Sequence, residues 1–218
     1  RSLAGSFYGD HCWEVPTTEY RSVMQEYFRP LLSDRLSACV EARAEAQEGQ
    51  RPDLLTIHLR GEDVFPDGET EKSASVRDKY GWQQPPCALY EKVFLEERFR
   101  SILVVTTRDW ANPCVSWLVA FGARRKVQVT VQNGTLFEDV CALLSSESLV
   151  AATSSFTHHL ALLSTRLRRL YYRDFGSFPP RDWLLRSDLP CDAWEGVTAI
   201  RYSVNLSQAL WPAPKQPF

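Results

Sequence analysis

The sequence lacks any uninterrupted run of about 18 apolar residues, so no segment is expected to cross a bilayer as a helix. It also lacks a basic excess, because the formal net charge of the 218 residues is −2. Without a positive field to attract phosphates, a nucleic-acid partner is not expected. The chain starts at Arg1 without a leader, so we expect a processed or incomplete product whose signal or anchor lies outside this sequence.

Metal-binding patterns are missing as well. The cysteines form no C-x-x-C pair and have no nearby histidine at ligand spacing, so no metal and no bound cofactor are expected. The six cysteines are Cys12, Cys39, Cys87, Cys114, Cys141 and Cys191. Their even number fits disulfides in an oxidising lumen, but apolar surroundings suit buried free thiols equally well, and both alternatives stay open. Two sequons, Asn133-Gly134-Thr135 and Asn205-Leu206-Ser207, lean toward the secretory pathway.

What is present is enough apolar sequence for a globular core, since 44% of the residues are hydrophobic and 12% are aromatic. Apolar runs of strand length alternate with segments whose apolar residues recur at helical spacing. Strands are predicted at 53–59, 101–107, 126–132 and 148–153, and helices at 86–99, 111–121, 136–145 and 156–170. This alternation predicts an α/β, Rossmann-like fold with a doubly wound parallel sheet.

Three regions are predicted along the chain. Residues 1–50 form a linker and one or two amphipathic helices, divided near Pro30, and lead into the Rossmann-like core at 51–173. Within this core, the polar segment 66–84 is expected to be a long loop. Residues 174–218, rich in proline and tryptophan, are expected to form an irregular extension that adds nothing to the sheet.

Polar side chains follow each predicted strand. In open parallel sheets ligands bind beyond the carboxyl ends of the strands, where loops and helix N-termini meet. Those ends carry residues 58–63, 106–109, 132–135 and 153–157. The sequence therefore predicts a binding site assembled from these segments.

The stretch "TSSFT" (153–157) places small hydroxyl residues where a strand turns into a helix. Free backbone N–H groups at a helix N-terminus bind anions, and a phosphate would fit there. The alternative is a Ser/Thr N-cap, which stabilises a helix by roughly 1 kcal/mol without any ligand and is the favoured interpretation of this stretch alone.

The stretch "LLTIHLRGEDVF" (54–65) ends a predicted strand on His58 and Arg60. These two side chains are expected on the same side of the strand, because side chains alternate with period two. Arginine binds phosphate with paired hydrogen bonds. An ion pair between Arg60 and Glu62 or Asp63 is an equally weighted alternative.

These motifs together resemble a known family. "IHLRGED" is similar to the H-x-R-x-x-D segment of the fucosyltransferase superfamily, which includes the α1,2- and α1,6-fucosyltransferases and the protein O-fucosyltransferases. "LVAATSSFT" is similar to the later S-S-F-T segment of that superfamily. "QPPCALYEKV", "ILVVTTRDW" and "LFEDVCALLSSESLVAATSSF" follow the family's order and spacing, so the resemblance covers residues 53–165.

The resemblance implies the C-terminal, GDP-fucose-binding half of a GT-B glycosyltransferase that is inverting and metal-independent. It implies that Arg60 contacts the β-phosphate, with His58 contacting the nucleotide sugar or supporting the arginine. It also assigns the pyrophosphate to Ser154, Ser155, Phe156 and Thr157, and a carboxylate facing guanine to Asp139 or Glu147. Asp63 is the candidate catalytic base.

Two departures from the family pattern are visible. Glu62 adds a carboxylate beside the expected diphosphate, and the N-terminal acceptor half of a GT-B enzyme is not contained in 218 residues. A missing N-terminal domain or a partner chain, a glycan or protein acceptor, and the Golgi or endoplasmic reticulum lumen are the corresponding expectations. A membrane anchor, if present, would lie in a segment outside this sequence.

Two other functions remain open. The chain can be a non-catalytic module, derived from a nucleotide-sugar-binding domain, that serves as a structural or interaction subunit of a larger assembly. It can also be another nucleotide-sugar enzyme of the same architecture, because fold does not determine substrate.

Overall fold

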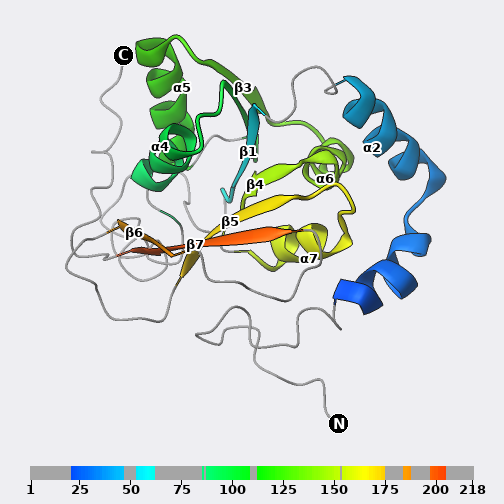
Figure 1. The fold of residues 1–218 in the computed structure, drawn as a ribbon. Helices are drawn as coiled ribbons and strands as arrows, with labels where there is room; N and C mark the ends of the chain where they lie inside the picture. Colours follow the sequence, from blue (N-terminus) through cyan, green and yellow to red (C-terminus); the bar gives the residue numbers. More distant parts are fainter. Residues whose placement is uncertain are drawn as a thin grey trace, which may run out of the picture.

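The computed structural model describes residues 21–46, 53–61, 85, 87–108, 112–152, 154–174, 184–187 and 197–204 (Figure 1). Within these ranges seven strands form one sheet in the order β3-β2-β1-β4-β5-β7-β6. The strands are β1 Leu54–Leu59, β2 Ser101–Thr106, β3 Gln128–Gln132, β4 Ser148–Val150, β5 Arg169–Asp174, β6 Leu184–Ser187 and β7 Thr198–Val204. Neighbouring strands run parallel, except that β6 is antiparallel to β7. The predicted α/β Rossmann-like class is confirmed.

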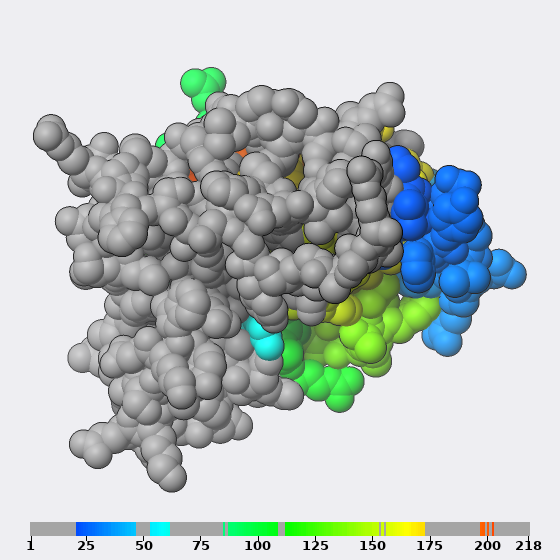
Figure 2. Space-filling model, turned by 90° about the horizontal axis from the view of Figure 1, so that it is seen from below, coloured from blue at the N-terminus to red at the C-terminus, as the bar shows by residue number. Residues whose placement is uncertain are grey.

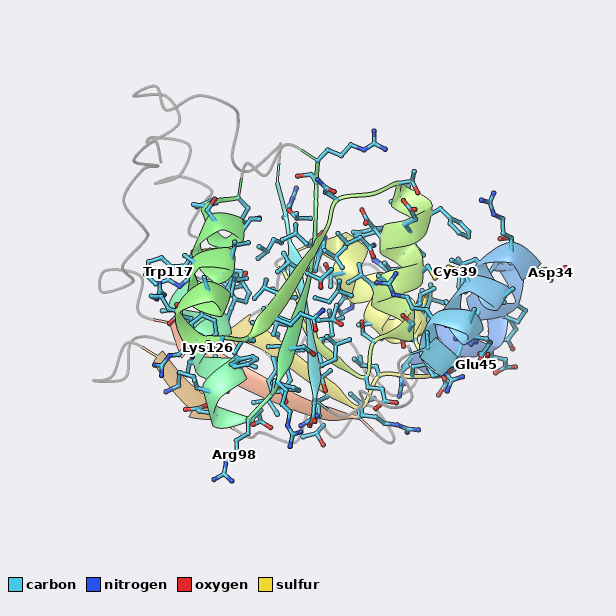
Figure 3. The ribbon with its side chains drawn as sticks, turned by 90° about the horizontal axis from the view of Figure 1, so that it is seen from above. Asp34, Cys39, Glu45, Arg98, Trp117 and Lys126 are labelled. Carbon is cyan, nitrogen blue, oxygen red and sulfur yellow. A yellow bond between two sulfur atoms is a disulfide. The ribbon has the colours of Figure 1, made fainter. Side chains whose placement is uncertain are left out.

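Helices cover both faces of the sheet. They are the π-helix η1 Met24–Phe28, the 3₁₀-helix η2 Arg29–Leu31, α2 Asp34–Ala46, α4 Cys87–Glu96, α5 Pro113–Arg125, α6 Leu136–Ser145 and α7 Ser155–Leu163. Figure 3 shows α4 and α5 on one side of the sheet, and α6, α7 and α2 on the other. The predicted division of the N-terminal helical region is confirmed, since Pro30 lies in η2 and α2 begins only at Asp34.

The core divides into two layers because side chains on a strand alternate between its faces. Leu55, Ile57 and Leu59 of β1 are at most 1% exposed and pack with α4 and α5. Thr56 and His58 point to the other layer, where Ser146 Oγ donates to Thr56 Oγ1 at 2.9 Å. The side chain of His58 is thereby directed toward the layer that holds α6 and α7.

Two predictions for the C-terminal third were wrong. The helix predicted at 156–170 ends at Leu163, because Ser164 Oγ accepts from the Leu167 N–H at 3.1 Å and donates to the Leu144 carbonyl at 2.8 Å. Residues 169–174 then form β5. The expectation that 174–218 adds nothing to the sheet is also corrected, because β6 and β7 extend it. Tyr202 of β7 is 0% exposed, so this strand supplies part of the core.

Two disulfides link pairs of helices. Cys39–Cys141 joins α2 to α6, and Cys87–Cys114 joins α4 to α5. The disulfide alternative is therefore the correct one for these four cysteines. Cys12 and Cys191 lie outside the described residues, as do the whole predicted loop at 66–84 and residues 1–20 of the predicted N-terminal region. Among the helices of the described ranges, none is long and apolar enough to span a bilayer.

Candidate functional site

The candidate site lies where the sheet topology reverses direction. From β1 the chain proceeds to β2 and β3 on one side, whereas β4 and β5 lie on the other side of β1. In doubly wound sheets this reversal opens a crevice at the carboxyl ends of the two central strands. The segment that follows β1 and the N-terminus of α7, which follows β4, both border this point. The strand order therefore brings together the two motifs that the sequence singled out.

His58 connects the two motifs directly. Its side chain is 8% exposed, and its Nδ1 is hydrogen-bonded to Oγ1 of Thr157, which is 0% exposed. The His58 ring also contacts Phe156, with ring centroids 5.7 Å apart. Burial, and secondarily the charge of Arg60, lower the pKa of His58 to about 4. His58 is therefore neutral at pH 7 and acts as a hydrogen-bonding link between β1 and α7.

Arg60 lies one residue beyond the end of β1 and is partly buried. Its carbonyl accepts from Asn112 Nδ2 at 2.9 Å, and Asn112 Oδ1 accepts from the Cys114 N–H at 2.9 Å. Asn112 is the N-cap of α5 and is only 1% exposed. The backbone at Arg60 is thus held against the start of α5. Glu62 and Asp63 lie outside the described residues, as does the ion pair considered for them. On the face seen in Figure 2, part of residues 53–61 (cyan) lies at the surface.

The N-terminus of α7 is capped by its own sequence. Ser154 is the N-cap, and its Oγ accepts from the Phe156 N–H at 3.2 Å. The N-cap interpretation of "TSSFT" is confirmed. Thr157, whose hydroxyl contacts His58, is the third residue of the same helix. Thr153 and the side chain of Ser155 lie outside the described residues. A cap of this kind is compatible with an anion, because several first-turn N–H groups of a helix have no intrahelical acceptor.

The two candidate guanine-facing carboxylates lie at opposite ends of the strands, one at the carboxyl ends and one at the amino ends. Asp139, in the first turn of α6, lies at the carboxyl edge, where Gln132 Nε2 at the end of β3 donates to its Oδ1 at 3.0 Å. Glu147 immediately precedes β4, in which Leu149 pairs with Thr56 of β1, so Glu147 lies level with the start of β1. At about 3.3 Å per residue, it is roughly 13 Å from His58 along the strand direction. The structure brings Asp139 to the edge that carries His58 and Arg60, and separates Glu147 from it.

Asp139 is surrounded by charged residues. Burial raises the pKa of Asp139, and a hydrogen bond from Gln132 and the charges of Arg43 and Arg108 oppose that rise. Arg108, two residues past β2, donates from Nε to the Gly134 carbonyl at 3.4 Å. Gln132 and the two arginines thus surround this half-buried carboxylate at the carboxyl ends of the strands.

Some residues of the site were not singled out from the sequence. Asn112 orders the backbone of Arg60, and its signal was present: asparagine directly before a proline and an apolar run is a typical N-cap with proline at the first helical position. Gln132 positions Asp139 but carries no comparable signal.

Thr106, at the end of β2 and paired in register with Leu59, is 3% exposed and its hydroxyl has no hydrogen-bond partner among the described residues. Across all the described residues, no group of three or more His, Cys, Asp or Glu side chains is placed to hold a metal ion.

Comparisons of the chain with protein-family models, curated proteins and solved structures give no match. The class of protein is therefore defined by the α/β parallel sheet and by the geometry at its carboxyl edge.

Proposed function

We propose that this chain provides the GDP-fucose-binding half of a glycosyltransferase that transfers fucose to a hydroxyl of a glycan or protein. The observation that carries the proposal is the hydrogen bond between His58 and Thr157. It joins the segment resembling the family's arginine motif to the segment resembling its S-S-F-T motif. Both segments border the topological reversal, which is the usual ligand position in a sheet of this class.

In this proposal the diphosphate lies between Arg60 and the first turn of α7. Arg60 supplies the positive charge for the β-phosphate, and Ser154, Ser155, Phe156 and Thr157 supply helix N-terminal donors. His58 is neutral and bound to Thr157, so its role is to support the arginine and hold α7 in place rather than to add a second charge. Asp139 is the carboxylate assigned to guanine. Glu147 lies at the opposite edge of the sheet and does not fit that role.

The reaction is a displacement at the anomeric carbon of fucose. The acceptor oxygen attacks C1, the bond from C1 to the β-phosphate oxygen breaks, and GDP leaves with inversion of configuration. Arg60 stabilises the negative charge that develops on the leaving diphosphate, so the step requires no metal ion. The proton of the acceptor hydroxyl passes to a base, for which Asp63 is the candidate. The acceptor-binding residues belong to a domain or partner chain outside this sequence, in a lumenal compartment.

A non-catalytic module is the second candidate function. The Ser154 and Thr157 hydroxyls are engaged by protein atoms, so the α7 N-terminus is ordered without any ligand. A domain that derives from a nucleotide-sugar-binding domain and now serves only in assembly would keep these contacts.

A titration of GDP against the chain tests the proposal. At roughly 100 times its dissociation constant, a ligand that binds only the folded state raises the free energy of unfolding by about 2.7 kcal/mol. We expect this stabilisation for GDP in urea unfolding, and its loss in Arg60→Ala. Arg124→Ala is the matched control, because Arg124 is an exposed arginine at the end of α5 that pairs with Glu91. If GDP fails to stabilise the native chain, binding of a GDP-sugar is excluded, and the transferase with it. A different outcome favours the non-catalytic module: GDP stabilises the chain, but the chain joined to its acceptor half does not transfer fucose.

Substitutions at Ser154 separate the cap from the anion site. We expect Ser154→Ala to lower the free energy of unfolding by about 1 kcal/mol, because the Phe156 N–H loses its acceptor. Ser154→Asp preserves a capping side chain and adds a negative charge, so stability is retained while GDP binding is lost through repulsion of the diphosphate. The measurements are urea unfolding and GDP titration of both variants. Unchanged GDP affinity in Ser154→Asp would place the diphosphate elsewhere.

A further inference from the structure

The connection between β3 and α6 carries the tripeptide Asn133-Gly134-Thr135. β3 ends the described sheet on one side, with β2 as its neighbour, so this connection lies at the outer edge. The side chain of Asn133 is exposed, and none of the hydrogen bonds found among the described residues involves it. A bulky group attached to Asn133 Nδ2 would extend into solvent from this edge.

The residues around Asn133 are held in place without its side chain. Thr135 is the N-cap of α6, with its Oγ1 accepting from the Glu138 N–H at 3.3 Å and the Glu138 carboxylate accepting from the Thr135 N–H at 2.7 Å. Arg108 donates to the Gly134 carbonyl. Modification of Asn133 would therefore leave the contacts that begin α6 intact.

The two disulfides indicate the compartment in which this turn is exposed. Each bond joins two helices, with Cys114 and Cys141 0% exposed, and protein disulfides of this structural kind form in oxidising compartments. In the secretory pathway of eukaryotes, surface Asn-x-Thr tripeptides accept N-linked oligosaccharides. The exposure of Asn133, its tripeptide and the oxidising compartment indicated by the disulfides are thus the three conditions that N-glycosylation requires.

We propose that Asn133 is an N-glycosylation site. The ligand class is an oligosaccharide activated as a lipid-linked diphosphate. A bond forms between Asn133 Nδ2 and C1 of the first sugar, the bond from C1 to the diphosphate oxygen breaks, the amide loses one proton and the lipid diphosphate leaves. The proposal does not rest on GDP-fucose binding, because its observations are the tripeptide, the exposure of Asn133 and the two disulfides. The sequon at Asn205 lies outside the described residues and serves as an internal comparison.

The test is translation of the full chain in a cell-free extract with microsomes, with an added N-terminal leader directing it into them. Peptide N-glycosidase treatment in ¹⁸O-labelled water marks each occupied asparagine by mass. We expect label at Asn133, and loss of the corresponding mobility shift in Asn133→Gln but not in Asn205→Gln. Translocated chain with intact disulfides and no label at Asn133 would overturn the proposal. So would a shift that Asn133→Gln leaves unchanged.

Substitutions at Thr135 provide matched variants. Thr135→Ser keeps both the sequon and the N-cap, whereas Thr135→Asp keeps a capping side chain but removes the sequon. We expect the glycan in the first variant and its absence in the second. Because microsomes modify newly translated chain, the mobility shift reports on occupancy even for a variant that folds poorly. A glycan retained at position 133 in Thr135→Asp would contradict the assignment.

Discussion

Replacing Cys39 and Cys141 together by alanine is expected to lower the free energy of unfolding by about 4 to 5 kcal/mol. The bond joins residues 102 positions apart, so its loss releases a long closed loop in the unfolded chain. For a domain whose stability is typically about 5 to 15 kcal/mol, this is a large fraction of the total. Urea unfolding of the oxidised native chain and of the double variant, at constant pH, measures the difference.

The second disulfide supplies the control for this experiment. Cys87 and Cys114 are 27 positions apart, so chain entropy assigns their bond about 3.5 kcal/mol. Cys87 is 1% exposed and Cys114 is 0% exposed, whereas Cys39 of the first bond is partly buried, so loss of packing alone would make the second pair the more costly one. We expect the Cys39 and Cys141 pair to cost more than the Cys87 and Cys114 pair. The reverse order would show that local packing, rather than closure of the longer loop, determines their contributions.

The first four strands were predictable because each is a short apolar run between breakers. β5 was not, because Leu160, Leu163, Leu167 and Leu170 continue a helical spacing through the end of α7. Only contacts distant in sequence distinguish the two outcomes: Ser164 binds the Leu144 carbonyl, and Arg169 pairs with Ser148 and with Thr198 on either side. β7 was not predicted either, because the prolines and tryptophans around it indicated irregular structure. Its strand conformation depends on pairing with β5.

The candidate site was predictable in its parts but not in its assembly. The sequence identified His58, Arg60 and "TSSFT" as strand-end segments, and offered a Ser/Thr N-cap within that last stretch. The strand order that makes β1 and β4 neighbours is a property of the whole sheet, and it alone decides that His58 meets Thr157. Asp139 and Glu147, eight residues apart, lie at opposite ends of the strands for a different reason. α6 crosses the sheet between them, and a motif alignment contains no such information.

Acidification is expected to destabilise the chain through His58. Its pKa is about 4 in the folded state, against an ordinary value of 6.5, because burial and the nearby Arg60 disfavour the charged ring. The unfolded chain therefore binds more protons between these two values, so stability is fully present above pH 6.5 and is lost as the pH falls toward 4. With about 1.4 kcal/mol for each pH unit, the loss from this residue amounts to about 3 kcal/mol.

Comparison of two histidine variants isolates this contribution. In His58→Gln the decrease in unfolding free energy between pH 6.5 and 4, measured by urea unfolding, should be smaller than in the native chain by about 3 kcal/mol. His158→Gln is the matched variant, since burial and the charge of His159 lower the pKa of His158 to about 3, but His158 lies on α7 outside the contact with Thr157. We expect both variants to reduce the acid dependence and only His58→Gln to weaken GDP binding at pH 7, because it removes the link that holds α7 against β1.

An unchanged pH dependence in His58→Gln would mean that His58 is not held neutral. Equal GDP binding in both variants would mean that its contact with Thr157 does not position the diphosphate site.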